Sequence, residues 1–369
     1  MKKKIIAGVA LGAAAVLGFA GPAMAASDLI TINENGGTGA DDGLKIQVAF
    51  GQIQVTGNGA VQLYSTDAVP DPSAYGNLSN YPIVVFNDPD EGVTVVGYSG
   101  LDDTDTFTDA TDAHAWESFT SESTIDGNSG TVTNHLVYSD GNSDEVNLDY
   151  KVSYTYPNQY LNLELTVTSV GADFTGVPYK MYWITDATLG GEDAGMQFGG
   201  TAASGAQLGG VVSPDGSTIQ SFRQTSGQSL NWFAGYYGCP MWENTDNECV
   251  PDGTANPNGL WIQNYQDFPN AASTVGTVDE PLDNGWGASS PELTAVNTAI
   301  NFDMIFASCL DGVEALQCAF DAAGESAPAA AAPVLATTGS DASAIVPAVA
   351  VMMLLGAAAT AFAVRRRNA

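Results

Sequence analysis

The chain has 369 residues, of which 42 are acidic and ten are basic, so its formal net charge is −32 at pH 7. This charge excludes nucleic acid and anionic membrane surfaces as partners, because like charges repel and the basic clusters that could release counterions, at 2–4 and 365–367, lie at the two ends of the chain. Aromatic and β-branched residues recur through the middle of the chain, which excludes a disordered protein and provides for a large core.

The first residues form three zones in a fixed order. A basic start at Lys2–Lys4 is followed by an apolar run from Ile5 to Ala20 and then by Ala23-Met24-Ala25. This order predicts a secretory signal peptide over 1–25, cleaved before Ala26. The alternative is an uncleaved N-terminal membrane helix, for which the apolar run is short. Both interpretations predict export.

Residues 26–320 alternate short apolar-polar segments with turns rich in Gly, Asn, Asp and Pro, a pattern that predicts an all-β fold. Val146–Tyr154 and Leu161–Thr168 each place apolar residues at every second position, so they predict a hairpin with one wet face. This many strands need two packed sheets, and we expect a large antiparallel β-sandwich. The further predicted strands are Ile46–Phe50, Gln52–Thr56, Ala60–Tyr64, Ile83–Phe86, Val93–Tyr98, Thr131–Tyr138, Val177–Ile184, Ile219–Gln224, Leu260–Asn264 and Ala299–Ala307.

Acidic turns are the most abundant polar feature, and one of them has the spacing of a cation site. Asp140, Asn142 and Asp144 alternate with small residues, so three side-chain oxygens could surround a calcium ion. The loop lacks the glycine and the distal glutamate of an EF-hand at their required positions. The alternative is a solvated hairpin turn. No other cofactor is predicted.

The stretch from Leu161 to Gly195 contains Leu-Glu-Leu-Thr-Val-Thr, Tyr-Trp-Ile-Thr-Asp and Gly-Gly-Glu-Asp-Ala-Gly in that order. In these segments the chain resembles the antiparallel supersandwich of galactose-mutarotase-like proteins, and the resemblance implies that fold. Mutarotase activity in that family needs a pair of histidines. The chain's two histidines, His114 and His135, both lie upstream of the resembling stretch, so the activity is not implied.

Two segments depart from the strand pattern. Gly199–Ser217 is rich in Gly, Ala and Ser, which predicts a long loop, with a domain boundary as the alternative. Asp311–Phe320 has Val313, Leu316 and Phe320 at helical spacing, which predicts a short helix.

The four cysteines form two local pairs in the sequence. Cys239 and Cys249 are ten residues apart, and Cys309 and Cys318 are nine apart. Four cysteines allow three connectivities, of which the two local pairings are the simplest, and an exported protein can form disulfides. Zinc is the alternative, but no C-x-x-C spacing or nearby histidine supports it.

Aromatic residues gather in Gly- and Asn-rich segments around the first cysteine pair. Exposed rings can stack on the apolar face of a sugar while neighbouring amides bind its hydroxyls, so this cluster predicts a glycan-binding site. The alternative is that the same rings fill the core and the ends of the sandwich. The residues are Trp232, Tyr236, Tyr237, Trp242, Trp261 and Trp286.

The C-terminal region follows an Ala- and Pro-rich linker over 321–334 and has three parts. Leu335-Ala336-Thr337-Thr338-Gly339 comes first, and the apolar stretch 344–364 follows, long enough at about 1.5 Å per residue to cross a bilayer as a helix. The basic tail 365–369 completes the sorting region 335–369 and places the preceding chain outside the cell.

This order resembles the cell-wall sorting signal of Gram-positive surface proteins, whose usual pentapeptide is Leu-Pro-x-Thr-Gly. Ala336 in place of proline matches the Leu-Ala-x-Thr-Gly variant of high-GC Gram-positive bacteria. The resemblance implies a sortase that attacks the carbonyl of Thr338, expels Gly339 with the membrane helix, and passes the acyl group to an amine of a peptidoglycan precursor. The alternative is an ectodomain that stays tethered to the membrane.

Together these patterns predict a surface protein held at the cell wall, in contact with the membrane only through its C-terminal helix before cleavage. Removal of both ends leaves 41 acidic and four basic residues. We expect the ectodomain to be a binding module for a glycan or a host surface ligand. A surface-retained carbohydrate-active enzyme and a passive structural coat protein are the alternatives. The sequence contains no nucleophile elbow, zinc-protease helix or phosphate loop, so no catalytic residue is assigned.

Overall fold

The computed structural model describes residues 29–328 apart from 39–41, 50–51, 58–60, 64–80, 98–110, 140, 142–144, 190–193, 226, 242–248, 250–258 and 274–283. The signal peptide, the linker from residue 329 on and the sorting region therefore lie outside the described residues. Within the described part, no helix is long and apolar enough to cross a membrane.

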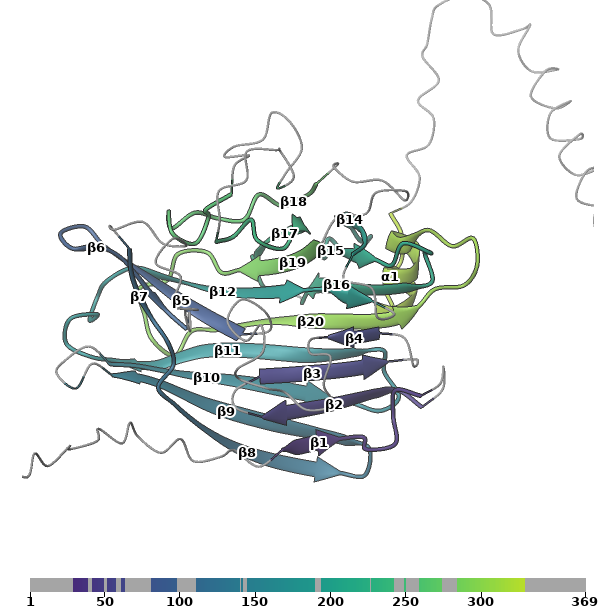
Figure 1. The fold of residues 1–369 in the computed structure, drawn as a ribbon, viewed down its shortest axis with the longest axis horizontal. Helices are drawn as coiled ribbons and strands as arrows, with labels where there is room; N and C mark the ends of the chain where they lie inside the picture. Colours follow the sequence, from purple (N-terminus) through teal and green to yellow (C-terminus); the bar gives the residue numbers. More distant parts are fainter. Residues whose placement is uncertain are drawn as a thin grey trace, which may run out of the picture. The chain divides into compact units, whose positions relative to one another are not determined.

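Strands dominate the described chain and form three sheets (Figure 1). The largest sheet has eight antiparallel strands. In spatial order they are β14 (Met196–Thr201), β15 (Gln207–Val212), β16 (Thr218–Gln224), β20 (Ala299–Ser308), β11 (Tyr160–Val170), β10 (Glu145–Tyr154), β9 (Ser129–Ser139) and β8 (Ser118–Asp126).

The other two sheets have seven and five strands. The seven-stranded sheet runs in the order β18 (Ala271–Ala272), β17 (Asn231–Tyr236), β19 (Asn284–Ser289), β12 (Tyr179–Asp186), β5 (Tyr81–Asp88), β6 (Gly92–Val96) and β7 (Thr111–His114). The five-stranded sheet runs in the order β1 (Ile30–Ile32), β2 (Leu44–Ala49), β3 (Gln52–Gly57), β4 (Val61–Leu63) and β13 (Thr188–Leu189).

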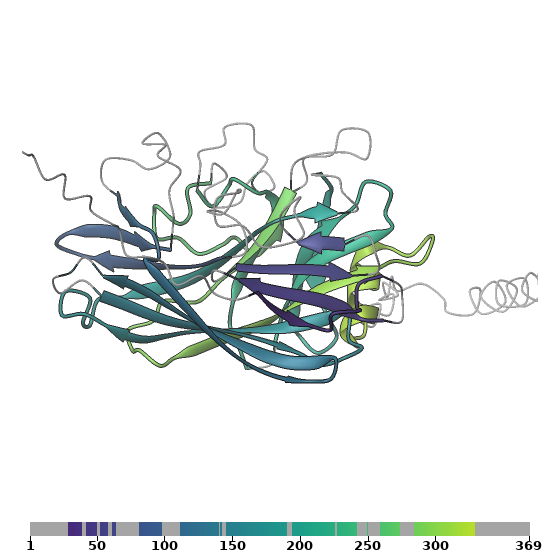
Figure 2. The same cartoon turned by 60° about the horizontal axis from the view of Figure 1, so that its bottom comes forward.

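All three sheets contribute side chains to one apolar core, and Figure 2 shows their strands from a second side. Alternate residues of each strand point into it because side chains of a strand alternate between its two faces. Leu148, Tyr150 and Val152 of β10 are fully buried there, together with Trp183 of β12 and Val48 of β2. The predicted all-β sandwich is confirmed.

The predicted hairpin is also confirmed. β10 and β11 pair antiparallel with Tyr150 opposite Leu165 and Val152 opposite Leu163, so the apolar positions of both strands share one face. The predicted strand over Leu260–Asn264 is wrong, because this segment is a series of turns. Leu260 has a positive φ of 59°, which ends any extended run there.

The predicted loop over Gly199–Ser217 is wrong as well, since residues 199–201 belong to β14 and residues 207–212 form β15. Its glycines have a packing role. The indole of Trp232 packs against Gly199 and Gly209, and a Cβ on either glycine would overlap the ring. Because glycine has no side chain, the strand pair β14–β15 can approach the tryptophan closely. In the sequence, such strand glycines cannot be distinguished from the glycines of a turn.

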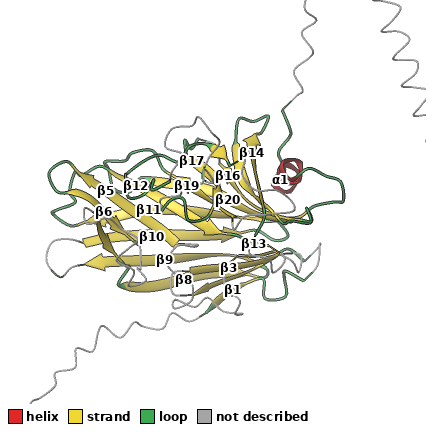
Figure 3. Ribbon diagram, turned by 45° about the horizontal axis from the view of Figure 1, so that its top comes forward, coloured by secondary structure: helices red, strands yellow, loops and turns green. Residues whose placement is uncertain are grey.

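Apolar residues also point outward from both large sheets. Outside the eight-stranded sheet, Leu208, Ile219 and Ile305 are covered by the helix α1 (Ala315–Ala323), which Figure 3 shows in red at one end of the sheets. Outside the seven-stranded sheet, Tyr182 and Phe233 are covered by the segment that follows β17.

The helix begins and ends later than the predicted Asp311–Phe320. Gly324 ends it in the left-handed conformation, at φ 67°, with its N–H bonded to the carbonyl of Asp321. The chain stays on the domain beyond this point, because Ser326 accepts a bond of 2.9 Å from the N–H of Ala203. The compact unit therefore runs to Pro328, past the predicted boundary at 320.

We expect Gly209→Ala to lower the free energy of unfolding by about 2 kcal/mol, because the new methyl group forces the Trp232 ring out of its site. Urea unfolding measures the change. In a variant that also carries Trp232→Leu, the same glycine substitution should cost less, since the overlapping ring is gone. Equal costs in the two backgrounds would contradict the packing argument.

Candidate functional site

Three of the predicted sugar-stacking rings are buried. Trp232 in β17 is 3% exposed, Trp261 is 1% exposed, and Trp286 in β19 is fully buried. A ring must offer an open face to stack on a sugar, so these three cannot form the predicted platform in this structure. Tyr236 and Tyr237 are partly buried and contact each other edge to face, with ring centroids 5.1 Å apart. Trp242 lies outside the described residues.

The buried rings serve two different cores. Trp286 lies between the sheets, where its ring meets Phe302 edge to face with centroids 6.4 Å apart. Trp261 lies outside the seven-stranded sheet, with Phe233 at 5.2 Å and Phe268 at 5.6 Å. For the described tryptophans, the core alternative is therefore the correct interpretation.

Lys180 ties the aromatic segment around Trp261 and Phe268 to the outer face of the seven-stranded sheet. Its side chain on β12 is nearly buried, with Nζ 2.8 Å from Asp267 and donating to the carbonyl of Tyr265 at 3.0 Å. The same ammonium lies 4.6 Å from the centroid of the Tyr265 ring. Burial is the main cause that raises the pKa of the Tyr265 hydroxyl, and the nearby carboxylates of Glu292 and Asp267 raise it further. The hydroxyl of Tyr265 therefore stays protonated.

Both predicted disulfides are present, with Cα atoms 5.5 Å apart in Cys239–Cys249 and in Cys309–Cys318. All four thiols are thus bonded, and the zinc alternative does not apply. Each disulfide belongs to a segment that covers an outer sheet face. Closing a loop of this size stabilises a fold by about 2 to 3 kcal/mol.

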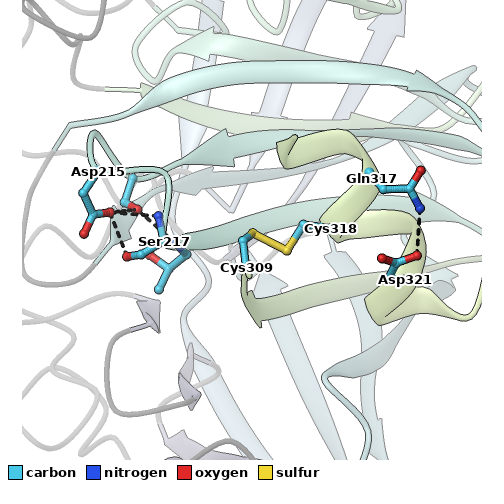
Figure 4. Close-up of a disulfide and its surroundings, with 8 residues drawn as sticks. Asp215, Ser217, Cys309, Gln317, Cys318 and Asp321 are labelled. Carbon is cyan, nitrogen blue, oxygen red and sulfur yellow. Dashed lines mark hydrogen bonds between the residues drawn. A yellow bond between two sulfur atoms is a disulfide. The ribbon is translucent and has the colours of Figure 1, made fainter. Parts of the chain in front are cut away.

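The surroundings of the second disulfide are acidic (Figure 4). Asp215 accepts hydrogen bonds from the hydroxyls of Ser213 and Ser217 and from the N–H of Ser217, and these bonds lower the pKa of its carboxyl. On the helix, Gln317 donates to Asp321 at 2.7 Å. Both carboxylates accept hydrogen bonds from residues close to them in sequence. No group of three or more metal-binding side chains occurs among the described residues.

The predicted calcium residues Asp140, Asn142 and Asp144 lie outside the described residues, so that site stays a prediction. The two histidines lie on different sheets. His114 in β7 stacks on Tyr138 with centroids 4.5 Å apart, and His135 in β9 bonds Asp149 at 2.7 Å. They do not form a pair.

The most developed polar site is centred on Arg223 of β16, which sequence reasoning missed. Its guanidinium bonds the carboxylate of Asp303 on β20 through two nitrogens, one of them Nε at 2.8 Å. Nη1 donates to the carbonyl of Ala323 at the end of α1, at 2.7 Å, and lies 3.4 Å from Glu325. The guanidinium also lies 5.0 Å from the ring centroid of Tyr160. One side chain thus joins two strands, the helix end and the departing chain.

Arg223 is one of the residues that line a hollow of about 630 Å³. Most of its lining side chains are polar, and they offer both hydrogen-bond donors and acceptors. This volume falls in the range of small-ligand sites. The lining residues include Ser204, Gln224, Thr225, Gln228, Asp303 and Glu325. A polyhydroxylated ligand suits such a lining, because its hydroxyls can both donate and accept.

A sequence signal for this site did exist. Arg223 is one of only four basic residues between the two predicted cleavage points, the others being Lys45, Lys151 and Lys180. In so acidic a chain, a lone arginine in a strand is a candidate for a buried ion pair. Its partners come from residues 80 and 102 positions away, so spacing alone could not find them.

Comparison with known proteins does not assign a family, since no protein-family model and no curated protein sequence matches this chain significantly.

We expect Arg223→Ala to lower the free energy of unfolding by about 3 kcal/mol, because it leaves Asp303 buried without its cation. The side chain of Asp303 is only 4% exposed. Lys151→Ala is the matched control, since that lysine is 43% exposed and 3.8 Å from Glu164, and it should cost less than about 1 kcal/mol. Equal losses in thermal or urea unfolding would contradict the assignment.

Proposed function

We propose that the protein is a surface protein of a Gram-positive bacterium, exported through its signal peptide and joined to the cell wall by a sortase. The single observation that carries this proposal is the order of the C-terminal parts: Leu335–Gly339, then the apolar stretch 344–364, then three arginines. A pentapeptide alone recurs by chance. A pentapeptide followed by a membrane span and a basic stop, in a chain with an export signal, is far more specific.

The position of the domain boundary supports this proposal. The compact unit ends at Pro328, and the pentapeptide begins at Leu335. The proposed bond to the wall forms at Thr338, ten residue steps after Pro328, and these steps reach at most about 35 Å when fully extended. The domain would therefore be held close to its attachment point, and any ligand would be bound near the wall.

The disulfides support an exported domain as well. Disulfides persist in oxidising compartments outside the cell and are rare in the cytosol. Both cysteine pairs are bonded and stabilise covers of the sandwich rather than a reactive site. The large sheets of eight and seven strands also suit the supersandwich arrangement of galactose-mutarotase-like proteins, which we propose for the ectodomain.

We further propose that the ectodomain binds a glycan in the Arg223 hollow rather than on aromatic rings. The support is the polar lining, with a fixed guanidinium, two carboxylates, amides and hydroxyls around about 630 Å³. Binding is favoured over hydrolysis because Asp303 and Glu325 both bond the same guanidinium. These are the two carboxylates among the described lining residues of the hollow, so its lining leaves no carboxylate outside the ion pairs to act as an acid or base on a glycoside.

Sortase anchoring predicts a sharp difference between neighbouring threonines. Thr338→Ala should block cleavage and leave the protein in the membrane fraction, whereas Thr337→Ala, at the variable position of the pentapeptide, should leave it anchored. Treatment of the cells with a wall-lytic enzyme, followed by fractionation, measures the outcome. Wild-type protein that remains wholly in the membrane fraction would contradict the proposal.

Glycan binding predicts retention of the protein on a glycan array without release of reducing sugar. Gln228→Ala, in the hollow, should weaken retention by about tenfold, as expected when a buried ligand contact is lost. Gln317→Ala, on α1, should leave it unchanged. Release of reducing sugar from a polysaccharide would favour the enzyme alternative, and neither binding nor turnover would favour the structural coat.

A further inference from the structure

The edge strand β8 (Ser118–Asp126) is unlike the other sheet edges of the described chain. It has nine residues and pairs only with β9 in the sheet. The edges of the other two sheets, β1, β13, β18 and β7, have between two and four residues. The opposite edge of its own sheet, β14, has six residues and lies against α1, where Leu316 packs on Gly200.

β8 is also open. Seven of its nine residues are exposed, and Ile125 is 44% exposed. Figure 1 shows the strand at the lower margin of the fold. Every second residue of an edge strand directs its N–H and C=O away from the sheet, so β8 offers a row of backbone groups to an added strand.

Natural proteins protect such edges with prolines, bulges, lysines or short strands. β8 contains no proline and no lysine, and its register with β9 runs without a shift from Ser118 to Asp126. The only charged residues in the strand are Glu122 and Asp126. The edge is therefore long, regular and unprotected except for its negative charge.

The negative charge of β8 disfavours a second copy of this chain as the partner. If two copies paired through β8 about a two-fold axis with full overlap, Glu122 at the centre of the strand would face its own copy. Like charges directly opposite each other destabilise a strand pair. Exposed Glu117 precedes the strand, and the whole chain carries a formal charge of −32, which adds to the repulsion between copies.

We propose that β8 is a docking edge for an extended segment of another protein, which adds as a strand and places a lysine or arginine opposite Glu122. Main-chain hydrogen bonds would supply the affinity, and the central charge pair would select the partner. This interaction surface is separate from the Arg223 hollow, and it does not depend on how the protein is attached to the cell.

The test uses the full chain in mild detergent and a nine-residue acetylated peptide, Thr-Thr-Ser-Val-Lys-Val-Ser-Thr-Thr. We expect this peptide to slow amide hydrogen exchange in β8. Glu122→Lys should weaken its binding roughly fivefold, because an attractive cross-strand pair becomes repulsive. The same variant should bind better a peptide with glutamate in place of the lysine. Glu122 is exposed, so its replacement should leave the melting temperature unchanged.

Glu91→Lys is the matched control, since it makes the same charge change in the exposed turn between β5 and β6. It should bind both peptides as the wild-type chain does. Equal weakening by Glu122→Lys and Glu91→Lys would overturn the proposal, as would exchange protection outside β8. Self-association of the wild-type chain through β8, seen by sedimentation, would overturn it in favour of a second copy.

Discussion

Apolar side chains point outward from both large sheets as well as inward, so each sheet needs a cover on its outer face. Ile219 and Ile305 would be exposed without α1, and Tyr182 and Phe233 would be exposed without the segment around Trp261. Burial of each such side chain contributes about 1.5 to 3 kcal/mol. Neither cover is a large element, and each is closed by its own disulfide. The covering of these two faces is the constraint on which the rest of the domain depends.

The Arg223 cluster completes the cover of the eight-stranded sheet. The guanidinium bonds the carbonyl of Ala323, the last residue of α1, and a carboxylate that is itself bonded by Asn162 of β11. The helix end, the departing chain and three strands thus meet at one cation. In the proposed function, this is where the domain connects to its wall attachment, so the same contacts that hold the cover also fix the exit of the chain.

The sequence predicted those parts of the fold that depend on local pattern. The period of two in Val146–Tyr154 and Leu161–Thr168 placed the central hairpin and its buried face, and the cysteine spacing indicated both pairings. The parts it missed depend on contacts between distant residues. Gly199 and Gly209 indicated a loop because their packing partner, Trp232, is remote in sequence.

The candidate site also depends on contacts between distant residues, which the sequence pattern does not show. Clustered aromatics are equally expected in a core and on a sugar platform, and only burial distinguishes the two. The polar hollow depends on Arg223, Asp303 and Glu325, which no spacing connects. The polar hollow and the long open edge strand β8 are the two surface features on which the proposed binding functions depend.

Sortase anchoring can be tested by the identity of the last residue of the mature protein. Protein released from the wall by a muramidase should be digested and its C-terminal peptide analysed by mass spectrometry. Sortase anchoring predicts a peptide that ends at Thr338 and carries a peptidoglycan fragment on its carboxyl group. A C-terminal peptide that continues through Gly339 into the apolar stretch would contradict it.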